Sequence, residues 1–262
     1  MTGRPLNIES GDWILPIAAA PRIWFGTDFD GTLTEHVDDP FAVALTPEMR
    51  DGLTRLAACP AVDMAIVSGR SLADLMPRVG LEGIAYSGNH GLEINAPGLK
   101  CRDPIAEVAR GQMNALKDQI ERKIQPYAGS FVEDKFLTLE VHYRLSTDHS
   151  RSAIRAMLDE LLGEAVTVRH TDFGSEIRPA GAGHKGTAAR QLWNYQSGGK
   201  GIPLFLGDSL TDEDAFLELP DGFTVKVGPG PTAARFRVNS PRDVLHIMHR
   251  LTELFVERRS LV

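Results

Sequence analysis

The stretch Ile23–Thr32, IWFGTDFDGT, determines how the rest of the chain is interpreted. Its first three residues are apolar and favour a buried β-strand, and two carboxylates, Asp28 and Asp30, follow them. In an extended chain, side chains two residues apart point to the same side. Two like-facing carboxylates at the end of a buried strand are costly unless a cation lies between them. The stretch therefore predicts a divalent-metal site at the carboxyl end of a sheet, where open α/β folds bind their ligands.

The composition is that of a soluble globular protein. The chain has 262 residues, of which 42% are hydrophobic and 24% charged, enough for one large domain or two ordinary ones. Its net charge of -7 argues against nucleic acid or an anionic membrane as a partner. Two cysteines, Cys59 and Cys101, cannot form a disulfide framework, which indicates a cytoplasmic protein. The apolar run 13–20 is too short to span a bilayer, and we expect a lead-in helix or arm there.

Strand-like and helix-like segments alternate in both outer parts of the chain. We expect strands at 23–25, 61–67, 83–86, 203–206 and 224–227, and helices at 47–58, 72–78, 186–195, 213–219 and 242–255. This order is typical of an α/β fold with a Rossmann-like parallel sheet and right-handed crossovers. We assign residues 1–100 and 181–262 to this core.

Residues 101–180 follow a different pattern. Amphipathic helices are expected at 104–123 and 150–162, and strands at 130–133, 136–143, 166–169 and 175–178. Apolar and polar residues alternate along 136–143, which suits an antiparallel sheet with one wet face. The segment is long enough to form an inserted α/β domain of its own.

Chemically informative residues follow the strands of the predicted core. They are Asp28 and Asp30, Ser68, Lys185, and Asp208 with Asp212. In this order they supply a carboxylate nucleophile, a hydroxyl that can hold an anion, a cation, and acids that can bind a metal. Their order and placement favour phosphoryl transfer, in which the site must neutralise the phosphate and align the attack.

Each group has a role in such a reaction. Asp28 would attack phosphorus and form an aspartyl-phosphate. Asp30 would protonate the leaving alcohol and then deprotonate the attacking water. Ser68 and Lys185 would hold the phosphate oxygens. The predicted Mg²⁺ ligands are Asp28, Asp30, Asp208 and Asp212.

Each stretch taken alone also fits a plainer role. A lone DxDG is most often a turn or part of a calcium loop, and SGR at 68–70 suits a simple strand-to-helix turn. Lys185 alone fits a solvated residue at a helix start. The acids of GDSLTDED at 207–214 suit a helix N-terminus, although four acids within seven residues is heavy for that purpose.

Four motifs together resemble those of the haloacid dehalogenase superfamily of phosphatases. They are DFDGT at 28–32, VSGR at 67–70, HKG at 184–186 and GDSLTDED at 207–214. The second aspartate, Asp30, is found in the phosphatases of that superfamily and is missing from its dehalogenases.

Longer stretches resemble the trehalose-6-phosphate phosphatases over about residues 22–240. They are the segment 28–50, YSGNHGLEI at 86–94, FVEDKFLTLEVHYR at 131–144, EIRPAGAGHKG at 176–186 and GDSLTDEDAF at 207–216. The resemblance implies Mg²⁺-dependent hydrolysis of a phosphorylated disaccharide, trehalose 6-phosphate, and makes 101–180 a cap domain that controls substrate specificity. It also implies a functional link to a trehalose-6-phosphate synthase, and we expect a monomer.

The resemblance also implies roles for individual residues. Asp28 would be the nucleophile, Asp30 the acid and base, and Asp208 and Asp212 metal ligands. The implied substrate contacts are Glu133, Lys135 and Glu176 in the cap and Arg70, Asn89 and His90 in the core. Members of the family usually have an aspartate where this chain has Ser209.

Several alternatives stay open at this stage. The EDK at 133–135 also fits a charged hairpin turn, and His90 also fits a solvated loop residue. The substrate could be sucrose phosphate, mannosylglycerate phosphate or glucosylglycerol phosphate, although GNHG together with EDK and VHYR favours trehalose. A non-catalytic sugar-phosphate sensor is the alternative from another class, and the intact Asp28 and Asp30 argue against it.

Overall fold

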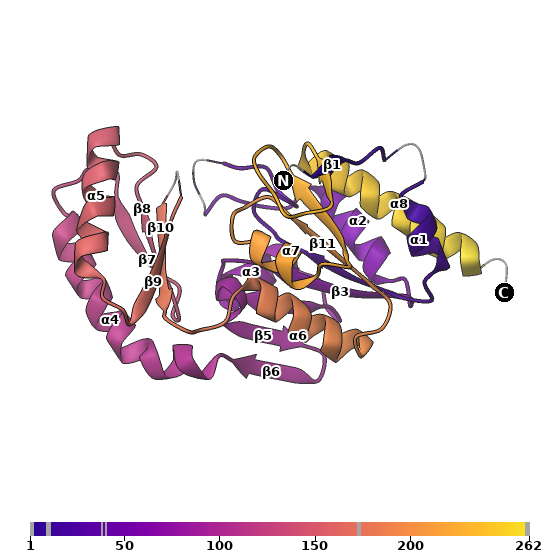
Figure 1. The fold of residues 1–262 in the computed structure, drawn as a ribbon, viewed down its shortest axis with the longest axis horizontal. Helices are drawn as coiled ribbons and strands as arrows, with labels where there is room; N and C mark the ends of the chain where they lie inside the picture. The colour runs from indigo at the N-terminus through magenta and orange to yellow at the C-terminus, as the bar shows by residue number, and fades with distance from the viewer. Residues whose placement is uncertain (1–2, 9–11, 38, 40, 172–173, 260–262) are drawn as a thin grey trace. The chain divides into compact units, whose positions relative to one another are not determined.

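The computed structural model describes residues 3–8, 12–37, 39, 41–171 and 174–259 (Figure 1). The chain divides into two compact units. Unit 1 consists of Met1–Lys100 and Gly183–Val262, and unit 2 consists of Cys101–Ala182.

A nine-stranded sheet forms the centre of unit 1, as far as the chain is described. In spatial order its strands are β1 (Arg4–Pro5), β13 (Phe236–Val238), β12 (Phe223–Val227), β11 (Ile202–Gly207), β2 (Ile23–Thr27), β3 (Val62–Val67), β4 (Ala85–Gly88), β5 (Glu93–Ala96) and β6 (Leu99–Arg102). All pairs from β1 to β4 are parallel, and β5 returns antiparallel to β4. The predicted α/β class with a parallel core sheet is confirmed.

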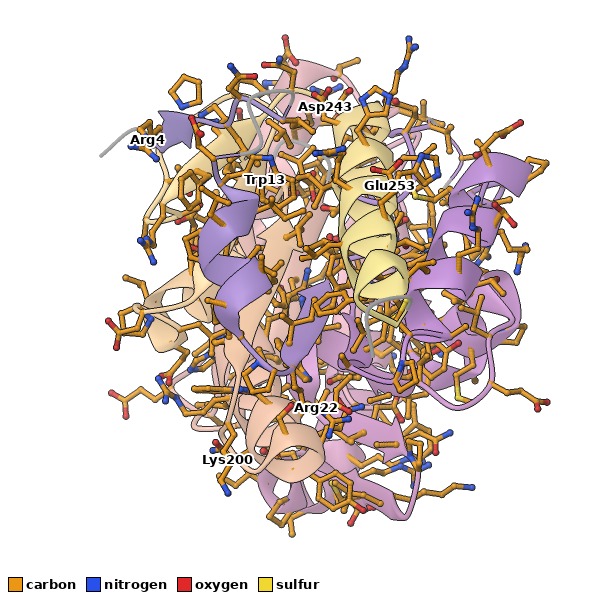
Figure 2. The ribbon with its side chains drawn as sticks, turned by 90° about the vertical axis from the view of Figure 1, so that its right-hand side faces the viewer. Arg4, Trp13, Arg22, Lys200, Asp243 and Glu253 are labelled. Carbon is orange, nitrogen blue, oxygen red and sulfur yellow. The ribbon has the colours of Figure 1, made fainter. Side chains whose placement is uncertain are left out.

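Helices cover both faces of this sheet. They are α1 (Ile14–Ala19), α2 (Pro47–Ala57), α3 (Leu72–Val79), α6 (Lys185–Ser197), α7 (Glu213–Glu218) and α8 (Pro241–Arg259). In Figure 2, α1 begins next to the labelled Trp13, and α8 runs over the same face of the sheet. On the opposite face, the indole Nε1 of Trp24 donates to Gln196 Oε1 of α6 at 2.9 Å. Because both faces are covered, every residue of β2 is buried.

Local sequence explains where the helices of unit 1 begin. Thr46 caps α2 by accepting a hydrogen bond from the Met49 N–H at 3.1 Å, and Pro47 occupies the first helical position. At α6, His184 forms a capping box with Thr187. This cap fixes the position of Lys185, the first residue of that helix.

Unit 2 is a four-stranded antiparallel sheet with two helices on one face (Figure 1). Its elements are α4 (Pro104–Ile124), β7 (Phe131–Asp134), β8 (Leu139–His142), α5 (Asp148–Leu161), β9 (Val166–His170) and β10 (Gly174–Pro179). The apolar residues of β8 and β10, such as Val141 and Ile177, pack with Ile120 of α4 and Ile154 of α5. Since side chains alternate along a strand, the residues between these apolar positions lie on the opposite face of the sheet.

The structure differs from the sequence prediction in a few places. The predicted strand 136–143 begins only at Leu139, because Phe136 has a positive φ of 75° and the Lys135 N–H bonds to Thr138 O in a turn. The short strands β1, β5, β6 and β13 were not predicted from the sequence, and none of them exceeds four residues. None of the helices in the described part of the chain combines the length and apolar character needed to cross a membrane.

Candidate active site

Asp28 lies immediately beyond the end of β2, between β11 and β3. Its N–H donates to Leu206 O of β11 at 2.9 Å, so the neighbouring strand fixes its backbone. Gly31 follows with a φ of 77°, and a Cβ at this position would come within 2.3 Å of Asp208 Oδ2. The motif therefore needs glycine here for its conformation and for the close approach of Asp208, which follows β11.

Lys185 connects the two acidic stretches of unit 1. Its Nζ lies 2.8 Å from Asp28 Oδ1 and 2.9 Å from Asp212 Oδ1, and the three side chains are at most 4% exposed. Burial lowers the pKa of Lys185, but the carboxylates of Asp212 and Asp28 outweigh it and raise this pKa above its ordinary value. The lysine is therefore held as a buried cation beside the proposed nucleophile.

Asp208 and Asp212 follow β11 and are held by different partners. His36 Nε2 lies 2.9 Å from Asp208 Oδ2. Burial raises the pKa of Asp208, but His36, Lys185 and Lys226 together outweigh burial and lower this pKa below its ordinary value. Asp212 Oδ2 accepts hydrogen bonds from Ser209, from its N–H at 2.9 Å and from its Oγ at 2.7 Å. Ser209, the departure from the family pattern, thus helps to orient one of the acids.

Three of these acids are close enough to share a metal ion. Asp28, Asp208 and Asp212 each offer an oxygen within 4.8 Å of the others, and no other such group of His, Cys, Asp and Glu occurs among the described residues. Burial, followed by the charge of Asp212, raises the pKa of Asp28 well above its ordinary value, although Lys185 opposes this. A buried excess of carboxylate oxygens fits a hard divalent cation.

Asp30 is not one of these three acids, and it pairs with Arg70. The guanidinium donates to both carboxylate oxygens, from Nε at 2.8 Å and from Nη2 at 2.7 Å, and it also donates to Asp74 at 2.7 Å. Asp28 and Asp30 were expected to share one cation, but Asp28 pairs with Lys185 and Asp30 with Arg70. The assignment of Asp30 as a metal ligand stays a prediction.

The ends of β3 and β4 bring Ser68, Asn89 and His90 together. Ser68 is buried, its Oγ accepts from the Arg70 N–H at 3.2 Å, and its carbonyl accepts from the His90 N–H at 2.9 Å. The imidazole of His90 packs on Gly69, where a Cβ would approach it to 2.4 Å. Asn89 and His90 have φ values of 50° and 57°, which cost energy for residues other than glycine. Such strain is concentrated at functional sites in proteins.

The three predicted contacts in unit 2 lie on or beside the sheet face that the helices leave uncovered. Glu133 belongs to β7 and Glu176 to β10, and Lys135 lies in the turn that follows β7. The His142 ring also faces this side and contacts Glu133 Oε2 at 2.7 Å. The structure thus groups these residues within their own unit.

Two residues of these clusters were missed by the sequence reasoning. His36 lies in an irregular loop, where no periodic pattern indicates which residues turn toward the acids. Glu140 contacts Lys135, and the alternation along 136–143 already predicted that its side chain shares a face with that of His142. That alternation was the available signal for Glu140.

Comparison with known proteins gives the family. The sequence model of the trehalose-phosphatase family matches residues 26–241. The chain belongs to the trehalose-phosphatase family. It is 35% identical over 249 residues to the trehalose-phosphate phosphatase of Mycobacterium tuberculosis, covering 90% of this chain and 62% of that relative. The chain thus spans less than two thirds of the length of the mycobacterial relatives that it matches.

Solved structures agree with this family assignment. The C-terminal domain of trehalose-6-phosphate phosphatase from C. albicans matches with a TM-score of 0.84 and 25% identity, over 96% of this chain and 98% of that one. A haloacid dehalogenase-like hydrolase from Bacteroides thetaiotaomicron matches with a TM-score of 0.62 at 14% identity, over 88% and 99% of the two chains, which shows the fold alone. The resemblance to trehalose-phosphatases of the haloacid dehalogenase fold is confirmed.

Proposed function

We propose that this chain is a Mg²⁺-dependent phosphatase that hydrolyses trehalose 6-phosphate to trehalose and phosphate. The observation that carries the proposal is the buried contact of Lys185 with both Asp28 and Asp212, next to Asp208, in a member of the trehalose-phosphatase family. A binding protein would not need to bury this many charges at the ends of β2 and β11, because burying charges is costly.

The proposed reaction proceeds in two steps. A carboxylate oxygen of Asp28 forms a bond to phosphorus, and the bond from phosphorus to the sugar oxygen breaks while Asp30 gives that oxygen a proton. In the second step, water forms a bond to phosphorus and gives a proton to Asp30. The bond between phosphorus and the Asp28 oxygen breaks, which releases phosphate and restores the Asp28 carboxylate. Asp30 suits this role, since its side chain is 35% exposed and can reach substrate and water.

The remaining charges would stabilise the transferred group. Lys185 would neutralise phosphate charge from a buried position, where a fixed cation acts more strongly than in water. Ser68 would hold a phosphate oxygen. Mg²⁺ bound by Asp28, Asp208 and Asp212 would supply further charge neutralisation.

We propose that the polar face of the unit 2 sheet recognises the sugar. Glu133 and Glu176 would accept hydrogen bonds from sugar hydroxyls, and Lys135 would donate to them. Arg70, Asn89 and His90 would contact the phosphorylated end of the substrate. We also infer a cytoplasmic enzyme that consumes the product of a trehalose-6-phosphate synthase, in keeping with Cys59 and Cys101, which form no disulfide.

Phosphate release from a panel of phosphorylated sugars tests the proposal. The panel contains trehalose 6-phosphate, sucrose 6-phosphate, glucose 6-phosphate and mannosyl- and glucosylglycerate phosphates, each with Mg²⁺ and with EDTA. We expect Mg²⁺-dependent release with a strong preference for trehalose 6-phosphate, and no release by Asp28→Asn. Preference for another sugar phosphate would contradict the proposal that trehalose 6-phosphate is the substrate. Binding of trehalose 6-phosphate without release of phosphate would instead indicate a sensor.

A further inference from the structure

A row of three carboxylates crosses three of the four strands in the sheet of unit 2, and Arg169 of β9 lies opposite the last of them. In the strand register, Glu133 of β7 lies directly opposite Glu140 of β8, and Glu140 lies directly opposite Glu176 of β10. Like charges directly opposite one another destabilise a sheet. Glu176 is only 5% exposed, and burial, followed by the charge of Glu140, raises its pKa. The carboxylate of Glu176 at the end of this row therefore costs folding stability, and a bound ligand would explain its presence.

Lys135 offsets part of this charge. Its Nζ lies 2.8 Å from Glu140 Oε2 and 4.0 Å from Glu133 Oε2, and its side chain is 10% exposed. Burial lowers the pKa of Lys135, but Glu140 and then Glu133 outweigh it and raise this pKa. The ammonium is therefore held between strands β7 and β8 mainly by Glu140.

A metal ion is a poor fit for this row. Among the described residues, the acids of unit 1 alone come close enough together to share an ion, and the ammonium of Lys135 already provides a cation in unit 2. Ionised carboxylates can only accept hydrogen bonds, whereas sugar hydroxyls can donate them. The row thus matches a neutral ligand rich in hydroxyl groups.

We propose that Glu140 is a specificity-determining residue that holds the Lys135 ammonium in place and completes, with Glu133 and Glu176, a row of hydrogen-bond acceptors for the hydroxyls of a disaccharide. This inference rests on the proposed function and adds one residue to the sugar site. We expect Glu140 to act on substrate affinity alone, because the contacts by which it would act, with Lys135 and with the neighbouring strands, all lie within unit 2.

The test compares Glu140→Gln with Glu160→Gln, the same chemical change at an exposed position on α5. With trehalose 6-phosphate we expect the KM of Glu140→Gln to rise about tenfold, as loss of one hydrogen bond to a charged group predicts, with kcat nearly unchanged. With p-nitrophenyl phosphate, which has no sugar hydroxyls, KM should not change. Glu140→Asp, which keeps the charge, should fall between wild type and Glu140→Gln and covers the case that the glutamine variant does not fold.

Three results would overturn this role of Glu140. They are an unchanged KM for trehalose 6-phosphate, an equal rise of KM for both substrates, and an equal effect of Glu160→Gln. Calorimetry separates this inference from the proposed function, because trehalose 6-phosphate can be bound to Asp28→Asn without turnover. Weaker binding by Asp28→Asn/Glu140→Gln than by Asp28→Asn supports the role even if wild type releases no phosphate. Equal binding by the two variants, or no binding by either, contradicts it.

Discussion

Each unit contains a lysine that contacts carboxylates, but the two lysines are held by different parts of the fold. In unit 1, Lys185 contacts Asp28, which lies 157 residues away in the chain, and both side chains are almost completely buried. In unit 2, Lys135 contacts Glu140, which lies five residues away in the same hairpin, and both side chains keep some exposure. One cluster depends on the whole topology of its unit, and the other depends on one turn and the register of neighbouring strands.

This difference suits the two proposed tasks. Chemistry at phosphorus needs charges held rigidly away from water, which the convergence of several strand ends provides. Recognition of a sugar needs acceptors that can exchange water for hydroxyl groups, and a partly exposed sheet face allows that exchange. Substitutions in unit 1 should therefore affect stability and kcat, whereas substitutions on the face of unit 2 should affect KM.

The largest expected effect is on stability. Lys185→Met leaves Asp28 and Asp212 buried without their cation, which should lower the free energy of unfolding of unit 1 by about 3–5 kcal/mol. Lys135→Met in unit 2 should cost less, because the side chains around it are more exposed. Urea unfolding in EDTA measures both losses of stability. Tryptophan fluorescence follows the loss caused by Lys185→Met, since Trp13, Trp24 and Trp193 all belong to unit 1. Circular dichroism follows the loss caused by Lys135→Met. Equal costs would contradict the contrast between the two lysines.

The next effect is on turnover. Asp30→Asn should lower kcat by about 10²–10⁴-fold, the usual contribution of a general acid and base, with little change in KM. Glu133→Gln should raise KM for trehalose 6-phosphate and leave kcat nearly unchanged. Steady-state kinetics of both variants, with wild type as control, measure these changes. A rise of KM in Asp30→Asn or a loss of kcat in Glu133→Gln would contradict the division between chemistry in unit 1 and sugar recognition in unit 2.

Mg²⁺ should stabilise unit 1 selectively. At a free concentration one hundred times its Kd, the ion should add about 2.7 kcal/mol to the free energy of unfolding of unit 1, by mass action. Tryptophan fluorescence during urea unfolding, with Mg²⁺ and with EDTA, measures this gain. Asp208→Asn should lose most of it. A gain that survives in this variant would place the metal elsewhere.

The smallest effect concerns the pH dependence of unit 2. Burial and the charge of Glu140 raise the pKa of Glu176 in the folded protein. As the pH rises, Glu176 therefore loses its proton in the unfolded chain before it does so in the folded protein. Stability is therefore lost as the pH rises from the unfolded to the folded pKa, and at neutral pH the carboxylate is a cost. Glu176→Gln should melt at a higher temperature than wild type at neutral pH, and this difference should vanish below the ordinary pKa of glutamate. Circular dichroism melting curves at neutral pH and below the ordinary pKa of glutamate measure the difference. A lower melting temperature of Glu176→Gln than of wild type at neutral pH would contradict this prediction.

Much of unit 1 could be predicted because strand ends meet at one edge of a parallel sheet. The apolar run before Asp28 and the position of Lys185 at a helix start were sufficient to group these side chains, and the structure brings them together. The pairing of Asp30 with Arg70 could not be predicted, because it depends on the path of a loop after β3.

The face of unit 2 was harder to predict for a physical reason. Alternation along a strand shows which residues share a face, but it does not give the register between strands. The alignment of Glu133 with Glu140 and of Glu140 with Glu176 therefore appears only in the structure. His36 beside Asp208 is likewise a loop contact that no sequence periodicity indicates.

The most direct test of the central claim is to look for a phosphoryl group on Asp28. The protein is mixed with trehalose 6-phosphate and Mg²⁺, quenched rapidly in acid, digested and examined by mass spectrometry. We expect the added mass of one phosphoryl group on the peptide that contains Asp28, and no such mass on the corresponding peptide of Asp28→Asn. Phosphate release without any modified peptide, or with the phosphoryl group on another residue, would contradict Asp28 as the nucleophile.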